Sequence, residues 1–192
     1  NSKFSLINYA NSIVLLILRN NLCNLVFFSH SVGGIIPILI AKQMKQKNLV
    51  KKFFNYEGNL TEYDTDTITK KTISYNMNEF DKKFNTLIGI CEQSSQREIR
   101  LWSDSLKKTS SKAFYDLSKD SVFLSKKNIL LQFFRIFFRR KLYMFGSNSL
   151  LKFSEFVFGS ERLILNNTGH FAFYDDKTKF LSIFLKLIYS CK

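Results

Sequence analysis

The sequence predicts an α/β fold, in which a parallel sheet with helices on both faces is interrupted by a mostly helical insertion. Two observations carry this prediction. Short apolar runs of strand length alternate with longer amphipathic segments in residues 1–58 and again in 141–192, with no hairpin signal between them. Between residues 59 and 140, Thr, Asp, Lys, Ser and Asn dominate, and only helical patches stand out. We therefore expect residues 1–58 and 141–192 to form the core and 59–140 to form the insertion.

The first part of the chain alternates helix and strand. Apolar side chains three and four residues apart predict a helix over 5–20, which the pair Asn20-Asn21 ends. The segments that follow are predicted as a strand at 25–28, a turn at 29–34, a helix at 35–47 and a strand at 50–56. Pro37 falls in the first turn of the second helix, where its missing N–H costs little. The strand–helix–strand order predicts a parallel crossover.

The later segments complete the sheet. We expect helices at 80–90, 96–106 and 129–138, strands at 141–145 and 162–165, a loop at 166–169 and a closing helix at 178–189. The stretch 133–141 is basic and rich in Phe, which is also compatible with a helix on a membrane surface. We favour a cap helix that packs its Phe face just before the next strand.

The bulk composition excludes several classes of protein. The 192 residues carry a net charge of +14, but the lysines are scattered singly or in pairs, so we expect no nucleic-acid partner. Cys23, Cys91 and Cys191 are far apart and outside any CxxC or Cys/His pattern, which argues against disulfides or zinc and favours the reducing cytoplasm. No apolar run approaches the roughly 18 residues that span a bilayer, so no integral membrane segment is expected. Because the sequence begins with Asn1 rather than Met, we interpret it as a fragment.

The strongest chemical signal is the stretch Ser29-His30-Ser31-Val32-Gly33, between a predicted strand and a predicted helix. A serine hydroxyl becomes a good nucleophile when it is exposed, next to a base and close to oxyanion donors. A tight strand-to-helix turn exposes the serine but strains its backbone, so the residues two before and two after it must be small, as in G-x-S-x-G. Ser29 replaces the first Gly and is still small. The alternative is an ordinary Ser/Gly loop.

One of the two histidines lies where a base for Ser31 is expected. His170 stands between the last predicted strand and the last predicted helix, which is the place of the general base in the chain order Ser, acid, His. A lone histidine is commonly a hydrogen-bonded structural residue, but this topology favours the catalytic role. His30 lies inside the serine turn, and we interpret it as a structural neighbour.

Further motifs follow the serine turn in order. They are E-G-N-L-T-x-x-D within Tyr56–Asp64, L-W-S-D-S at Leu101–Ser105, L-Y-M-F-G at Leu142–Gly146 and G-H-F at Gly169–Phe171. Together with the turn they resemble the α/β-hydrolase family, and the first of them resembles one bacterial subgroup. The resemblance implies a partial α/β-hydrolase fold with Ser31 as nucleophile and His170 as base. It also implies that residues 59–140 form a helical cap over the active site.

The acid of the implied triad is not at the family's usual position. Most of the family carries Asp in a G-x-x-D pattern after the penultimate strand, but Gly146–Ser149 contains no carboxylate. Glu57 ends the strand after the serine turn, where some relatives such as haloalkane dehalogenases carry their acid. We favour Glu57 as the residue that orients His170. The alternatives are a Glu57 that caps the residues after it or pairs with a lysine, and Glu155 or Glu161, neither of which ends a strand.

The oxyanion hole is incomplete in this sequence. The N–H of Val32 supplies one donor, whereas the second normally comes from a loop after the third strand of the fold. We expect that loop and about four strands to precede this sequence, so the missing N-terminal part of the fold is a candidate partner that would cover the open sheet edge. The sequence contains no P-loop, no GxGxxG and no metal-spaced cluster, so we expect no cofactor.

These observations predict a hydrolase that acts on an ester-like or related small molecule through Ser31, His170 and Glu57. The first alternative is an inactive remnant or subunit of a split α/β-hydrolase, which would keep the fold without the turnover. The second is a basic peripheral-membrane binding protein, which would need its lysines on one face.

Overall fold

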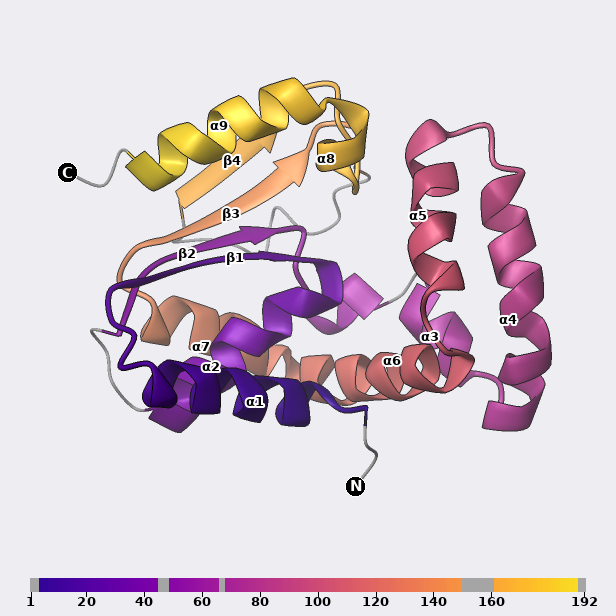
Figure 1. Cartoon of the computed structure of the whole chain (residues 1–192), viewed down its shortest axis with the longest axis horizontal. Coiled ribbons are helices and arrows are strands. Elements are labelled where there is room, and N and C mark those ends of the chain that lie inside the picture. The colour runs from indigo at the N-terminus through magenta and orange to yellow at the C-terminus, as the bar shows by residue number, and fades with distance from the viewer. Residues whose placement is uncertain (1–3, 45–48, 66–67, 150–160, 190–192) are drawn as a thin grey trace.

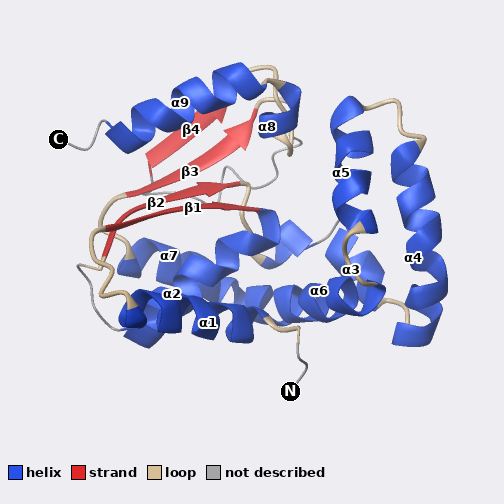
Figure 2. Cartoon of the chain, viewed as in Figure 1, coloured by secondary structure: helices blue, strands red, loops and turns tan. Residues whose placement is uncertain are grey.

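The computed structural model describes residues 4–44, 49–65, 68–149 and 161–189, and its centre is a four-stranded sheet (Figure 2). The strands lie side by side in chain order: β1 (Leu25–His30), β2 (Val50–Tyr56), β3 (Lys141–Gly146) and β4 (Glu161–Leu165). All three pairings are parallel, as the strand–helix–strand order predicts. The predicted α/β class is therefore confirmed.

Three helices cover one face of the sheet: α1 (Leu6–Arg19), α2 (Ile35–Met44) and α7 (Ile129–Phe137). Because successive strand residues point to opposite faces, Phe53, Tyr143 and Phe145 share this side. They pack in one buried cluster with Ile38 of α2 and Phe134 of α7. The Phe face of α7 is thus part of the core. This packing argues against a helix that binds a membrane surface through the same face.

Two helices cover the other face: α8 (Ala172–Asp175) and α9 (Lys177–Tyr189). The alternate residues of β2 and β3, such as Phe54 and Met144, pack here against Phe180 of α9. Helices on both faces explain why β3 is buried from Leu142 onward and β2 from Phe53 onward, whereas Lys51 near the start of β2 is exposed.

The segment between β2 and β3 is helical apart from its turns. It contains η2 (Glu62–Thr65), α3 (Ile68–Ile73), α4 (Met77–Glu92), α5 (Arg97–Lys107), α6 (Ser111–Ser125), η3 (Lys126–Asn128) and then α7. Helices α4 and α5 stand at one end of the sheet (Figure 1) and share a small apolar cluster of their own with α6. The division into a core of 1–58 and 141–192 and a cap of 59–140 stays a prediction, since α7 lies within 59–140 but packs in the core.

The short helices α3 and α8 were not expected from the sequence, and two further elements differ from the expectation. Strand β1 continues through Ser29 and His30, because both pair with β2 in register. Helix α6 was not expected, since its buried positions are small residues rather than large apolar ones: Ala113, Ser118, Ser121 and Ser125. Such a face produces little hydrophobic periodicity.

Residues 45–47 of the predicted second helix lie outside the described part of the chain. Within that part, no helix is long and apolar enough to cross a membrane.

Candidate active site

The predicted site residues gather at the carboxyl ends of the strands. Ser31 follows β1, Glu57 follows β2 and His170 follows β4. These three and Val32 line one cleft of about 1020 Å³. The carboxyl edge of a parallel sheet is where α/β proteins commonly bind ligands, because loops from several strands meet there.

Ser31 occupies a strained turn. Its φ is 53°, a left-handed conformation that is uncommon for a residue with a side chain. Strand β1 ends at His30, and the short helical segment η1 (Ser31–Gly34) begins at Ser31. The backbone N–H of Asn59 donates to the Ser31 carbonyl at 3.1 Å, which ties the turn to the residues after β2.

The steric demand of this turn falls one residue later than the G-x-S-x-G argument expects. A Cβ added to Gly33 would meet nothing within 4 Å, whereas one at Gly34 would lie 2.7 Å from Asn55 Oδ1 and from the Gly58 Cα. Ser29, two residues before Ser31, is buried and donates from its hydroxyl to Asn55 Oδ1 at 3.0 Å. The turn therefore packs on Asn55 through Ser29 and Gly34.

Glu57 and His170 are brought together. The Nδ1–H of His170 donates to Glu57 Oε2 at 2.7 Å, and since a carboxylate only accepts, this bond places the ring proton on Nδ1. The Glu57 side chain is 12% exposed and that of His170 is 40% exposed. Glu57 has a φ of 43°, a second left-handed residue at this edge of the sheet.

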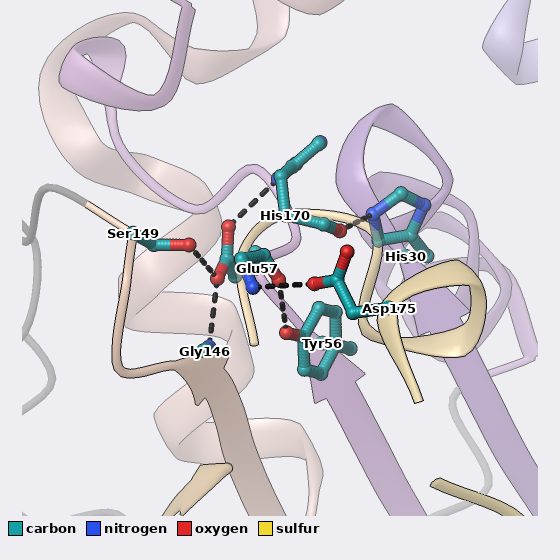
Figure 3. A network of polar contacts seen from close by, with 8 residues as sticks. His30, Tyr56, Glu57, Gly146, Ser149, His170 and Asp175 are labelled. Carbon is teal, nitrogen blue, oxygen red and sulfur yellow. Dashed lines mark hydrogen bonds and ion pairs between the residues drawn. The ribbon is translucent and has the colours of Figure 1, made fainter. Parts of the chain in front are cut away.

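The other oxygen of Glu57 is held by the loop after β3 (Figure 3). Oε1 accepts from the Gly146 N–H at 2.9 Å and from the Ser149 hydroxyl. Burial alone would raise the pKa of Glu57, but the hydrogen bonds from His170, Ser149 and Gly146 outweigh it and lower the pKa. Glu57 is therefore held as a carboxylate.

The alternative role of Glu57, capping the residues after it, is filled by Asp64. The backbone N–H groups of Leu60 and Thr61 donate to Asp64 Oδ2 at 2.7 and 2.6 Å, so Asp64 caps this turn. Glu155 lies outside the described residues, as does the side chain of Glu161.

Ser31 and His170 line the same cleft. Among the described residues, no hydrogen bond joins the Ser31 hydroxyl to the His170 ring. Hydrogen bonds between a nucleophile and its base often form only when substrate binds, so the lack of this bond is compatible with such a pair.

A network that sequence reasoning missed holds the loop of His170 (Figure 3). The Tyr56 hydroxyl donates to the Gly169 carbonyl at 2.5 Å, and the Gly169 N–H donates to Asp175 Oδ2 at 2.6 Å. His30 Nε2 lies 2.7 Å from the His170 carbonyl oxygen. Tyr56 and His30 are far from this loop in the chain, and no local pattern marks such contacts.

The far side of the cleft is formed by α5. Gln96, Arg97, Glu98, Ile99, Trp102 and Ser105 line it from this side. The centroid of the Trp102 ring lies 5.7 Å from that of Phe171, the residue after His170. The cleft is thus enclosed between the loops of the sheet and an aromatic-bearing helix of the inserted segment. Within the described part of the chain, no group of His, Cys, Asp and Glu side chains could hold a metal ion.

Solved structures match this fold. A carboxylesterase of the ammonia-oxidizing thaumarchaeon Nitrososphaera gargenis superposes with a TM-score of 0.72 at 14% identity, over 98% of this chain and 73% of that chain. The chain has part of the α/β-hydrolase fold. An esterase from Exiguobacterium antarcticum gives a TM-score of 0.69 at 16% identity, over 98% and 75% of the two chains. A bromoperoxidase from Bacillus anthracis gives 0.67 at 14%, over 98% and 75%.

The α/β-hydrolase fold does not by itself determine the reaction. The similar structures include esterases and a bromoperoxidase, and at these identities the match shows the fold alone. No protein-family model and no curated protein matches the sequence. The chemistry must therefore be argued from the site.

Proposed function

We propose that this protein hydrolyses ester-like small molecules through Ser31, His170 and Glu57. The observation that carries the proposal is the bond from His170 Nδ1 to Glu57 Oε2, in the cleft that Ser31 also lines. That bond orients the imidazole so that Nε2 is the nitrogen available as a base. Esterases among the structures with the same fold support this class of substrate.

The proposed reaction has two steps. Ser31 Oγ attacks the ester carbonyl and gives its proton to His170 Nε2, and the N–H of Val32 donates to the oxyanion that forms. His170 then returns the proton to the leaving alcohol, and an acyl-enzyme remains. Water repeats the sequence to release the acid. Glu57 stays ionised throughout and stabilises the imidazolium.

The cleft supports a substrate with an apolar part. Trp102, Phe171 and Phe173 present rings to it, while Ser31 and His170 lie at the sheet side. We assign the helical residues 59–140 as the cap that encloses the substrate. A specific substrate is not encoded in these residues, because many small esters fit a cleft of about 1020 Å³.

A fluorophosphonate probe tests the nucleophile. Phosphonylation forms a bond from Ser31 Oγ to phosphorus, expels fluoride and passes the serine proton to His170. We expect intact-mass labelling of the wild type and none of Ser31→Ala. Labelling of Ser31→Ala to the wild-type extent would contradict the proposal, and no labelling of either would favour the inactive remnant.

We also propose that the edge of β1 receives further strands of the same fold. Among the described residues β1 and β4 are the two edge strands of the sheet, and Val26 on β1 is exposed. The chain spans about three quarters of the solved structures it resembles. A protein extended by the upstream coding sequence should label faster, because it would gain the second oxyanion donor, worth about 10²–10³ in rate.

We further propose a cytoplasmic location, which suits the free thiols of Cys23 and Cys91.

A further inference from the structure

His30 connects the serine turn to the loop of the base. Its Nε2 lies 2.7 Å from the carbonyl oxygen of His170, although 140 positions separate the two residues in the chain. A carbonyl oxygen only accepts, so Nε2 must carry the proton and donate it. The two imidazole rings also pack together, with their centroids 4.5 Å apart (Figure 3).

The surroundings of His30 keep its ring neutral and in place. Tyr56, Phe171 and Phe173 lie around it, with ring centroids 5.8, 5.5 and 5.1 Å away. Burial, together with the nearby His170, lowers the pKa of His30 from 6.5 to about 4. Its one proton is engaged with the His170 carbonyl, which makes the ring a fixed donor rather than a second base.

We propose that His30 is a positioning residue that sets the distance between Ser31 and His170. It directly precedes Ser31, so its bond to the His170 carbonyl ties the nucleophile's turn to the backbone of the base. The inference rests on the proposed function, since it presumes that Ser31 and His170 react as a pair.

The other contacts of this loop reach different atoms from different elements. Tyr56 ends β2 and binds the Gly169 carbonyl, while Asp175 in α8 binds the Gly169 N–H. Each of these bonds fixes the loop relative to β2 or α8. Among the described side chains in this network, His30 is the one that belongs to the serine turn. A small displacement between reacting groups is costly, about 10²-fold for a shift of 1 Å.

The test distinguishes the contribution of the His30 N–H donor from that of its aromatic ring. His30→Phe keeps an aromatic ring but removes the donor, and His30→Gln keeps an N–H that can reach the carbonyl. Tyr115→Phe is the matched control, because it also removes a side-chain donor to a distant backbone carbonyl: the Tyr115 hydroxyl donates to the Tyr75 carbonyl at 2.9 Å. Turnover of p-nitrophenyl acetate and the rate of fluorophosphonate labelling are measured for each.

We expect His30→Phe to lower kcat about 10- to 100-fold with little change in KM, His30→Gln to recover most of that loss, and Tyr115→Phe to match the wild type. Hydrogen exchange gives a readout that does not need turnover. The amides at 169–171 should exchange faster in His30→Phe than in wild type, and the exchange in Tyr115→Phe should be unchanged there. If His30→Phe does not fold, His30→Asn takes its place, because its shorter amide does not reach the carbonyl.

Wild-type kcat and wild-type exchange in a folded His30→Phe protein would overturn the inference. An inert Ser31→Ala protein in the same series would leave the proposed function standing. If Ser31→Ala instead keeps full activity, the proposed function fails, whatever His30→Phe does. Equal losses in His30→Phe and His30→Gln would also overturn the inference, because the donor would then not be what matters.

Discussion

Glu57 at the end of β2 and Ser149 in the loop after β3 are in contact through their side chains. The resemblance implies a carboxylate in the Gly146–Ser149 stretch, and the structure has a serine hydroxyl there that donates to Glu57 Oε1. The carboxylate thus comes from the end of β2, while the loop after β3 supplies donors to it. The other oxygen of Glu57 faces His170.

Removing the charge at position 57 should stop turnover but not folding. Glu57→Gln keeps the shape of the side chain but favours the wrong imidazole tautomer, and the analogous change in serine proteases costs about 10⁴ in kcat. Ester turnover and far-ultraviolet circular dichroism are compared with those of Glu62→Gln, an exposed glutamate in η2. Equal turnover of Glu57→Gln and the wild type would rule out Glu57.

The position of the acid should be transferable. In the wild type, Ser149→Asp would place a second carboxylate against Glu57, so one of the two should stay protonated and turnover should fall. In the Glu57→Gln background the same Ser149→Asp change should restore part of the lost rate. The measurement is ester turnover of both single variants and the double variant. No gain in the double variant would mean that a carboxylate introduced at position 149 does not reach His170.

The buried His30 should make stability depend on pH. The native ring resists protonation down to a pKa of about 4, whereas the unfolded ring titrates at 6.5, so the unfolded state binds an extra proton between these values. The contribution of His30 to the free energy of unfolding should have its full value above pH 6.5. It should fall by as much as about 3 kcal/mol as pH approaches 4. The neighbouring titratable groups are His170 and Glu57, and the lowered pKa of Glu57 adds a loss in the same direction.

Urea unfolding at pH 7 and pH 5 measures this dependence. His30→Phe has no imidazole at this position and should lose less stability between the two pH values than the wild type does. The same loss in both proteins would assign the dependence to other groups.

At the scale of elements, the turn from β1 into α2 is shaped by its packing on β2. Asn55 of β2 accepts from Ser29, and its side chain lies where a Cβ at Gly34 would project. A backbone neighbour, the Gly58 Cα, limits the same space. The turn therefore depends on residues that follow it by more than twenty positions.

Adjacent glycines should respond in opposite ways. Gly34→Ala should destabilise by about 1–3 kcal/mol, because the backbone at Gly58 must move. Gly33→Ala meets nothing within 4 Å and should be neutral or stabilising by a few tenths of a kcal/mol to about 1 kcal/mol through the unfolded state. Chemical denaturation of the two variants decides this, and an equal loss in both would contradict the packing argument.

At the scale of the whole molecule, the cleft joins parts of the chain with separate apolar clusters. Phe80, Phe84 and Leu106 form one cluster among α4, α5 and α6, while the sheet packs with other helices. The two parts meet where Trp102 of α5 lies near Phe171. The cleft thus lies between two parts of the molecule that have separate apolar clusters.

Trp102→Ala should weaken substrate binding and spare the chemistry. We expect KM for aromatic or long-chain esters to rise about tenfold or more, because apolar contact in the cleft is lost, while the labelling rate of Ser31 by a small fluorophosphonate changes little. Phe123→Ala in α6, which removes a ring that is 68% exposed, is the control. An unchanged KM in Trp102→Ala would show that α5 does not contact the substrate.

The sequence by itself determined the strands, their parallel order and the turn that carries Ser31. These depend on apolar runs, helical spacing and small residues, all of which are local. It missed α6, where Ser118, Ser121 and Ser125 are buried in place of large apolar side chains. The sequence also predicted that Gly33 must be small, whereas it is Gly34 that has close neighbours in the structure.

Only the tertiary structure decided which groups meet at the site. The sequence left Glu57 beside other candidates, because the bond to His170 joins residues 113 positions apart. Parallel register sets His30 beside Tyr56 and Tyr56 beside Met144, and this brings Glu57 to the loop after β3. Contacts across strand ends depend on that register, which no local pattern of residues encodes.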